Sequence, residues 1–237
     1  LQIIGELANR YNVVVIEDLA YFAMDFRKDY SKPGQAPFQP TVGKYTDNYV
    51  LLISSSKAFN YAGERIGMMV VSDKVWQMRS PDLLRYFSSD QLGHALVFGA
   101  IYAISSGTSH SAQYALAAIL KAVNDGQINF VEIAKEYGEK AKIMKRLFTE
   151  NGFRIVYDKD LDEPIADGFY FTFAYPGMSG SQLLSELVHY GISAITLGIT
   201  GSERHEGLRA CTSLVQREQF PVLEERLKRF REDHPIA

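Results

Sequence analysis

One lysine of this sequence stands where covalent chemistry could take place. Lys57 follows three serines, Ser54 to Ser56, at the end of the hydrophobic run "YVLLISSS". A lysine just past a buried strand can be partly desolvated, which makes its amine a usable nucleophile toward a carbonyl group. The alternative is a lysine in an ordinary surface loop, with no chemical role.

The residues around this lysine favour the binding of a phosphate. Ser54 and Ser56 offer hydroxyl donors, and Arg65 offers a planar fork of N–H groups that suits phosphate oxygens. Gly63 and Gly67 flank Arg65, and glycines let the backbone approach a ligand closely. The segment therefore predicts an anion site beside a reactive amine.

A second group of polar residues follows the run "NVVVIEDL", which predicts a strand buried on both faces. Asp18 ends this strand and Tyr21 comes three residues later. In an open α/β sheet, ligands bind at the carboxyl ends of the strands. Asp18 could hold a protonated heterocyclic nitrogen, and Tyr21 could donate to a phenolate-like oxygen. Alternatively, Asp18 is a helix N-cap and Tyr21 a core aromatic.

A third candidate is Arg209, within the apolar segment "LRACTSLV". Burying an arginine is costly unless the guanidinium meets an anion. A substrate carboxylate would satisfy it through two parallel hydrogen bonds. The alternative is an edge strand from which Arg209 points to solvent.

Hydrophobic periodicity predicts the elements that would position these residues. The first half reads as an opening helix, three strands and two further helices over residues 82–105 and 110–124. The second half reads as a helix over roughly 128–150, then short strands and helices, and a final charged helix. We therefore predict an α/β protein of two domains, residues 1–124 and a smaller α+β domain of residues 125–237.

The composition excludes several classes of protein. The chain has 237 residues and a net charge of -3, with acids and bases interspersed, so neither nucleic acid nor a membrane surface is an expected partner. We find no signal peptide and no apolar run of the ~18 residues that a membrane span needs. Cys211 is the only cysteine, and the five histidines lack the spacing of metal ligands. We expect a cytoplasmic protein without a metal site.

Taken in order, the motifs resemble those of the fold-type I pyridoxal-phosphate enzymes, specifically the class I/II aminotransferase family. That family carries Asp-x-x-Tyr at a strand end, then Ser-x-Ser-Lys, then Gly-x-Arg-x-Gly, then an arginine in a late strand. Here they stand as "DLAY" (18–21), "SSSK" (54–57), "GERIG" (63–67) and "LRACTS" (208–213). The resemblance implies that residues 1–124 are the C-terminal part of a large, mostly parallel-sheet domain. Ser55 and Tyr61 are unusual for the family and suggest an outlying subfamily.

The resemblance also implies roles around pyridoxal 5'-phosphate. Lys57 would form a Schiff base with the cofactor aldehyde and, once released, would move the proton between the substrate Cα and the C4′ carbon of the cofactor. Asp18 would keep the pyridine nitrogen protonated, so that the ring acts as an electron sink. Tyr21 would hydrogen-bond the ring oxygen.

The remaining roles implied are binding roles. Ser54, Ser56 and Arg65 would hold the phosphate, and Arg209 the substrate α-carboxylate. The expected function is an aminotransferase that moves an amino group from an amino acid to a 2-oxo acid, in a homodimer. Two alternatives stay open: a lyase on the same fold, and the aminotransferase-like domain of a transcription regulator.

The resemblance further implies that part of the cofactor site lies upstream of Leu1. Family members are far longer, and the upstream part would carry a phosphate-binding turn, an aromatic that stacks on the ring, and an asparagine. None of these motifs occurs in the sequence. We therefore expect this chain to be a fragment that is inactive alone.

Overall fold

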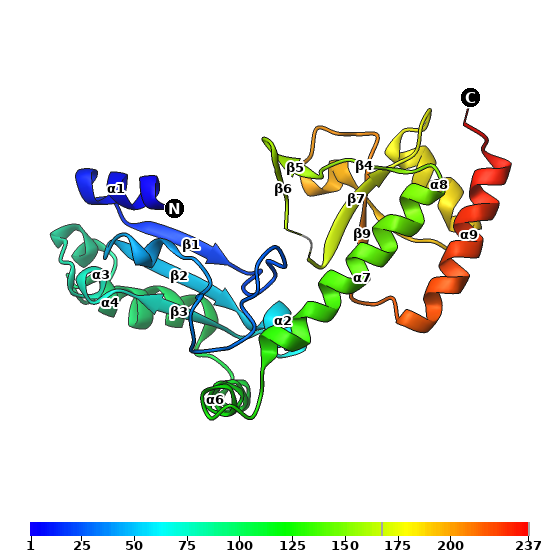
Figure 1. Cartoon of the computed structure of the whole chain (residues 1–237). Helices are drawn as coiled ribbons and strands as arrows, with labels where there is room; N and C mark the ends of the chain where they lie inside the picture. Colours follow the sequence, from blue (N-terminus) through cyan, green and yellow to red (C-terminus); the bar gives the residue numbers. More distant parts are fainter. Residues whose placement is uncertain (167, 237) are drawn as a thin grey trace. The chain divides into compact units, whose positions relative to one another are not determined.

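The computed structural model describes residues 1–166 and 168–236, and the chain forms two compact units (Figure 1). Unit 1 comprises Leu1–Ala23 and Tyr30–Val131, and unit 2 comprises Met24–Asp29 and Glu132–Ala237. The two units differ from the predicted domains in their boundary, which follows Val131 rather than residue 124. Phe130 explains the difference, because its ring is buried with Ala23 and Ala58 in a core cluster of unit 1.

Unit 1 is built on a three-stranded sheet in the order β1 (Val15–Leu19), β2 (Tyr49–Ser54), β3 (Gly67–Val71). β1 and β2 are parallel, with Asp18 opposite Leu52. β2 and β3 are antiparallel, with Ser54 opposite Gly67. The predicted strands are therefore present, and the two parallel strands end at the same edge of the sheet.

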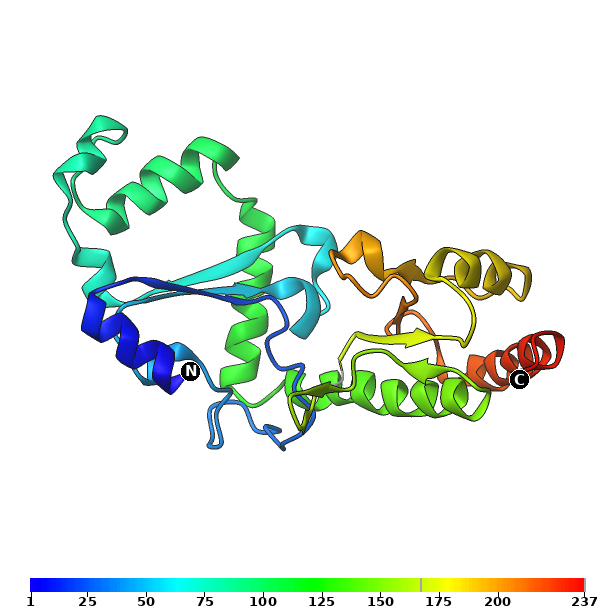
Figure 2. The same ribbon diagram turned by 90° about the horizontal axis from the view of Figure 1, so that it is seen from above.

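The helices of unit 1 are α1 (Gln2–Tyr11), the short α2 (Ser55–Ala58) and α3 (Asp73–Gln77), and the longer α6 (His110–Asn124). α6 crosses the sheet (Figure 2) and buries Ala112 and Leu116 against Ile66 of the β3 side.

The helix predicted over 82–105 is wrong in its first part. A 3-10 turn at Pro81–Arg85 is followed by a loop, and the helical path resumes only with α4 (Leu92–His94), a π-helical stretch (Ala95–Ile101) and α5 (Tyr102–Ser105). The chain turns back here because Ser80 N donates to Asp90 O at 2.9 Å.

The expectation that β1 is buried on both faces is also wrong. Ile16 is 66% exposed and Val13 is 54% exposed. β1 is an edge strand in this sheet, and Ile16 stays largely exposed among the residues that the structure describes. A run of β-branched residues predicts a strand, but it does not reveal what packs on each face.

Unit 2 contains a four-stranded antiparallel sheet in the order β4-β7-β9-β8. These strands are β4 (Arg154–Ile155), β7 (Tyr170–Ala174), β9 (Leu208–Cys211) and β8 (Ile195–Thr196). A small hairpin pairs β5 (Lys159–Asp160) with β6 (Glu163–Pro164). The helices are α8 (Gly180–His189), α9 (Phe220–Asp233) and most of α7 (Phe130–Glu150).

Aromatic side chains fill the core of unit 2. Phe148 of α7 lies 4.4 Å from the ring of Phe173 and 5.1 Å from that of Phe153, measured between centroids. Phe230 of α9 completes the cluster at 5.3 Å from Phe153. These contacts join both helices to the sheet and make the strand that carries Arg209 part of a well-packed scaffold. In the described ranges, no helix is both long and apolar enough to cross a membrane.

Candidate active site

Lys57 lies at the carboxyl end of β2, in α2 and not in an irregular loop (Figure 1). Ser54 caps this helix, since its Oγ accepts a hydrogen bond from Ser56 N at 3.1 Å. Lys57 is half-buried, and its Nζ lies 5.7 Å from the centroid of the Tyr21 ring. The structure thus brings together a lysine and a tyrosine that are 36 positions apart in the sequence.

Ser55 holds this turn in place, a role that sequence reasoning missed. The side chain is fully buried at 0% exposure, and its Oγ donates a short hydrogen bond to Ile66 O. Ser55 O in turn accepts from Tyr61 N at 3.1 Å. Nothing in the sequence distinguishes Ser55 from the serines on either side of it.

Arg65 stands at the end of the turn in a left-handed backbone conformation, with a φ of 52°. This region is uncommon for residues with a side chain, and such strain clusters at functional sites. The side chain is exposed, and its Nη1 donates to Ala62 O at 2.7 Å. Within residues 1–166 and 168–236, the other guanidinium N–H groups have no partner, so they are able to bind an anion.

Gly63 and Gly67, the two glycines around Arg65, differ in the space available for a side chain. A Cβ on Gly67 would lie 2.9 Å from Ile53 O, so the close pairing of β2 and β3 requires glycine there. A Cβ on Gly63 would meet nothing within 4 Å. Close approach at Gly67 is thus to the neighbouring strand, whereas the space at Gly63 is open.

One open hollow of about 450 Å³ is lined by four of the predicted site residues: Asp18, Ser54, Ser56 and Arg65. They meet because β1 and β2 are parallel, so that the end of each strand delivers its polar residue to the same edge. The walls are apolar side chains of the strands, with Ile101 from the π-helical stretch. A shallow site with a carboxylate, two hydroxyls and a guanidinium can bind a small ligand with separate cationic and anionic groups.

Asp18 and Tyr21 are both exposed, so the alternative of a core position for Tyr21 does not hold. Asp18 Oδ1 accepts from Ala20 N at 2.9 Å, which shapes the turn after β1, while the carboxylate itself is exposed. Tyr21 is 50% exposed, so it is not a core aromatic. Both side chains can be reached by a ligand from solvent.

Arg209 belongs to unit 2, whereas the other six predicted site residues belong to unit 1. It lies in β9, between β7 and β8, so the alternative of an edge strand does not hold. The Arg209 guanidinium carbon lies 4.2 Å from the centroid of the Tyr170 ring. The Nε atom is buried and has no hydrogen-bond partner among the residues described.

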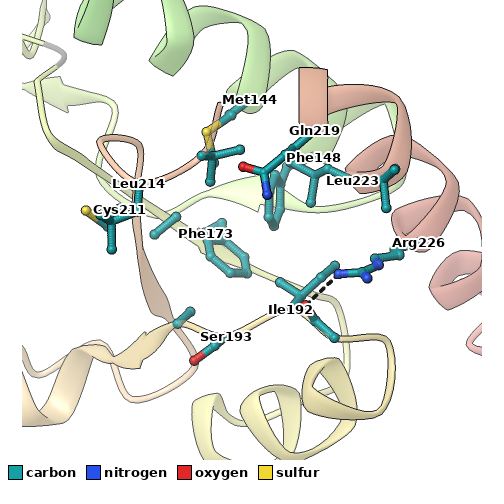
Figure 3. Close-up of a pocket in the computed structure, with 15 residues that line it drawn as sticks. Met144, Phe148, Phe173, Ile192, Ser193, Cys211, Leu214, Gln219, Leu223 and Arg226 are labelled. Carbon is teal, nitrogen blue, oxygen red and sulfur yellow. Dashed lines mark hydrogen bonds between the residues drawn. The ribbon is translucent and has the colours of Figure 1, made fainter. Parts of the chain in front are cut away.

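Other parts of the chain offer less chemistry. Figure 3 shows a pocket of about 310 Å³ in unit 2, over Phe148 and Phe173, with Arg226 donating to Gly191 O at 2.8 Å. Its lining is mostly apolar, and none of the predicted site residues lines it. In the part of the chain that the structure describes, no three His, Cys, Asp or Glu side chains are grouped to hold a metal ion.

Comparison with known proteins identifies the family. The model of the family "Aminotransferase class I and II" matches residues 1–219. The chain belongs to this family. No curated protein sequence matches the chain.

Solved aminotransferase structures share the fold. The α-aminoadipate aminotransferase LysN of Thermus thermophilus, complexed with N-(5'-phosphopyridoxyl)-L-leucine, matches with a TM-score of 0.67 at 18% identity, over 97% of this chain and 53% of that one. An alanine aminotransferase from Pyrococcus furiosus gives 0.67 at 17% identity, over 98% and 52%. An aminotransferase from Mycobacterium tuberculosis gives 0.68 at 14% identity, over 98% and 52%.

These matches confirm the predicted fold class, a mixed α/β fold of the fold-type I aminotransferases. This family member spans about half the length of the solved structures that it matches. At such identities the likeness concerns the fold alone, and the roles of individual residues depend on the geometry described above.

Proposed function

We propose that the whole protein is a pyridoxal-phosphate-dependent aminotransferase that moves an amino group from an amino acid to a 2-oxo acid. The observation that carries this proposal is the hollow at the ends of β1 and β2, where Asp18, Ser54, Ser56 and Arg65 meet. Lys57, the proposed attachment point, follows directly in α2.

The donor set of the hollow fits pyridoxal phosphate. The cofactor has a phosphate, and Ser54, Ser56 and Arg65 offer hydroxyl and guanidinium donors in the lining of the hollow. It has a pyridine nitrogen, and the exposed carboxylate of Asp18 lies in the same hollow. It has an aldehyde and a ring oxygen, for which the Lys57 amine and the nearby Tyr21 are suited.

In this mechanism the residues bind groups and move protons. The bound cofactor supplies an electron sink for negative charge at the substrate Cα. Asp18 would hold the proton on the pyridine nitrogen, and Tyr21 would donate to the ring oxygen. Lys57 would hold the cofactor at its aldehyde carbon, and its free Nζ would take the Cα proton and return it.

For Arg209 of unit 2 we propose a separate role, the binding of the substrate α-carboxylate. Its half-buried guanidinium has an unpartnered Nε in the described chain, which a carboxylate oxygen would satisfy. We also propose that the whole protein is a cytoplasmic homodimer. The single cysteine supports a reducing compartment, and the family resemblance supports the dimer.

Borohydride reduction of the whole protein with pyridoxal phosphate, followed by peptide mass spectrometry, tests the proposal. We expect the reduced cofactor on the peptide that contains Lys57, and amine exchange between an amino acid and a 2-oxo acid in the unreduced protein. Lys57→Ala should abolish both, while Lys74→Ala, an exposed lysine of α3, should leave both intact. Attachment that survives Lys57→Ala would refute the assignment.

A further inference from the structure

We propose that Tyr170 is a positioning residue, which holds the Arg209 guanidinium by the face of its ring so that the N–H groups of the arginine stay available to a carboxylate. The inference rests on the proposed function, since it concerns how the substrate carboxylate is bound. Nothing in the sequence motifs points to Tyr170, because the contact depends on the pairing of two strands.

The register of β7 and β9 places the two side chains on one face of the sheet. Thr172 is directly opposite Arg209, and Tyr170 is opposite Cys211. Tyr170 is therefore the diagonal neighbour of Arg209, at a spacing that long side chains can bridge. The Arg209 guanidinium carbon lies 4.2 Å from the ring centroid, well inside the range of a cation–π contact.

Tyr170 also has packing contacts of its own. Its ring packs against a cluster formed by Met24, Ala134 and Phe169, and the centroids of the Tyr170 and Phe169 rings are 6.1 Å apart. Tyr137 of α7 backs Phe169 in turn, at 4.4 Å between ring centroids. A ring held by these contacts can restrict the arginine that lies over it.

An aromatic ring suits the positioning of the Arg209 guanidinium better than a carboxylate side chain would. A carboxylate at this position would neutralise Arg209 and occupy the N–H donors that a substrate needs. The face of the Tyr170 ring attracts the guanidinium cation but does not occupy the N–H groups, which lie in the plane of the guanidinium group. In the described residues, Arg209 has no carboxylate within 4 Å, and its buried Nε has no acceptor. The arrangement leaves the guanidinium charge for a ligand.

A second arginine of unit 2 offers a contrast and a control. Arg204 lies 5.9 Å from the Tyr157 ring but pairs with Glu206 at 2.9 Å. Its charge is therefore already compensated. Tyr157→Leu removes an arginine–tyrosine contact from the same unit without touching the proposed carboxylate site.

The test compares variants of the whole protein loaded with pyridoxal phosphate. Propionate binding is followed by ligand-observed NMR, and KM and kcat are measured with an accepted amino acid. For Tyr170→Leu we expect a Kd for propionate and a KM that rise about 5- to 30-fold, with kcat changed less than about 3-fold. Tyr170→Phe, which keeps the ring, should stay within about 2-fold of the wild type, as should Tyr157→Leu.

Each outcome decides the proposal. Unchanged propionate binding in Tyr170→Leu overturns it, and so does equal loss in Tyr170→Phe, because the hydroxyl and not the ring face would then matter. Propionate binding that survives Arg209→Leu also overturns it. Should Tyr170→Leu fail a melting test for folding, Tyr170→Met fills the volume with a flexible side chain and takes its place. A protein that binds propionate through Arg209 but exchanges no amine would refute the proposed function and leave the role of Tyr170 standing.

Discussion

Replacing Gly67 by alanine should destabilise unit 1, whereas the same change at Gly63, four positions earlier, should not. A Cβ added at Gly67 is not free to move, because it would meet backbone atoms: Ile53 O at 2.9 Å and Ser54 Cα at 3.6 Å. β2 and β3 would have to separate by a few tenths of an ångström next to the predicted phosphate site. Neither glycine has a positive φ, so backbone strain does not contribute.

The expected magnitude follows from two opposing effects. Forcing an extra carbon into a packed site costs about 1–3 kcal/mol. Alanine also restricts the unfolded chain, which contributes about 0.4–1 kcal/mol in the opposite direction. With the middle of each range, the net loss in free energy of unfolding for Gly67→Ala is about 1 kcal/mol. Gly63→Ala has no clash to offset, so it should be neutral or more stable by up to about 1 kcal/mol.

Denaturant unfolding of the purified protein measures both values, and cofactor attachment is measured in parallel by borohydride trapping. A Gly67→Ala protein as stable as the wild type would refute the packing argument, as would a strongly destabilised Gly63→Ala protein. If Gly63→Ala keeps its stability but loses cofactor attachment, the open space at Gly63 serves a ligand. That result would support the interpretation of this glycine drawn from the sequence.

Two further predictions concern Arg65 and Tyr190. Arg65→Gly relieves the left-handed backbone at a φ of 52°. The free energy of unfolding should therefore stay equal or rise by up to about 1 kcal/mol, while retention of pyridoxal phosphate in dialysis falls. A loss of stability would contradict the strain argument. The Tyr190 hydroxyl donates to Asp233 at 2.6 Å, and this hydrogen bond raises the pKa of Tyr190 to about 12. Because the unfolded chain loses this proton first, the bond stabilises fully below pH 10.0 and ceases to do so as pH rises through about 12. The difference in melting temperature between wild type and Tyr190→Phe should shrink over that range. A constant difference would contradict the stabilising role of the hydrogen bond between Tyr190 and Asp233.

Much of the candidate site could be predicted from residue types and spacing. The motifs from Asp18 to Arg209 follow the order of the family, and the family model matches residues 1–219. The strand that contains Asp18 and the strand that precedes Lys57 were predicted by β-branched and aliphatic runs and are present as β1 and β2. Local pattern suffices for these elements because β-branched and aliphatic residues in a short run favour a strand.

Other expectations failed where packing over long distances decides. The helix predicted over 82–105 is broken because Ser80 bonds back to Asp90. The first unit extends to Val131, and the ring of Phe130 within it packs with residues more than seventy positions away. A helical or strand-like period cannot report such contacts, since it is a property of neighbours in the sequence.

By itself, the sequence determined the family, the strands that end at the site and the residue types able to bind a phosphate, an amine-reactive group and a carboxylate. Only the tertiary structure decided which of them meet. Parallel pairing of β1 and β2 brings Asp18 and Ser54 to one hollow, and antiparallel pairing of β7 and β9 places Tyr170 beside Arg209. Which strands pair, and in which direction, depends on contacts between segments far apart in the chain, which the pattern within one strand does not specify.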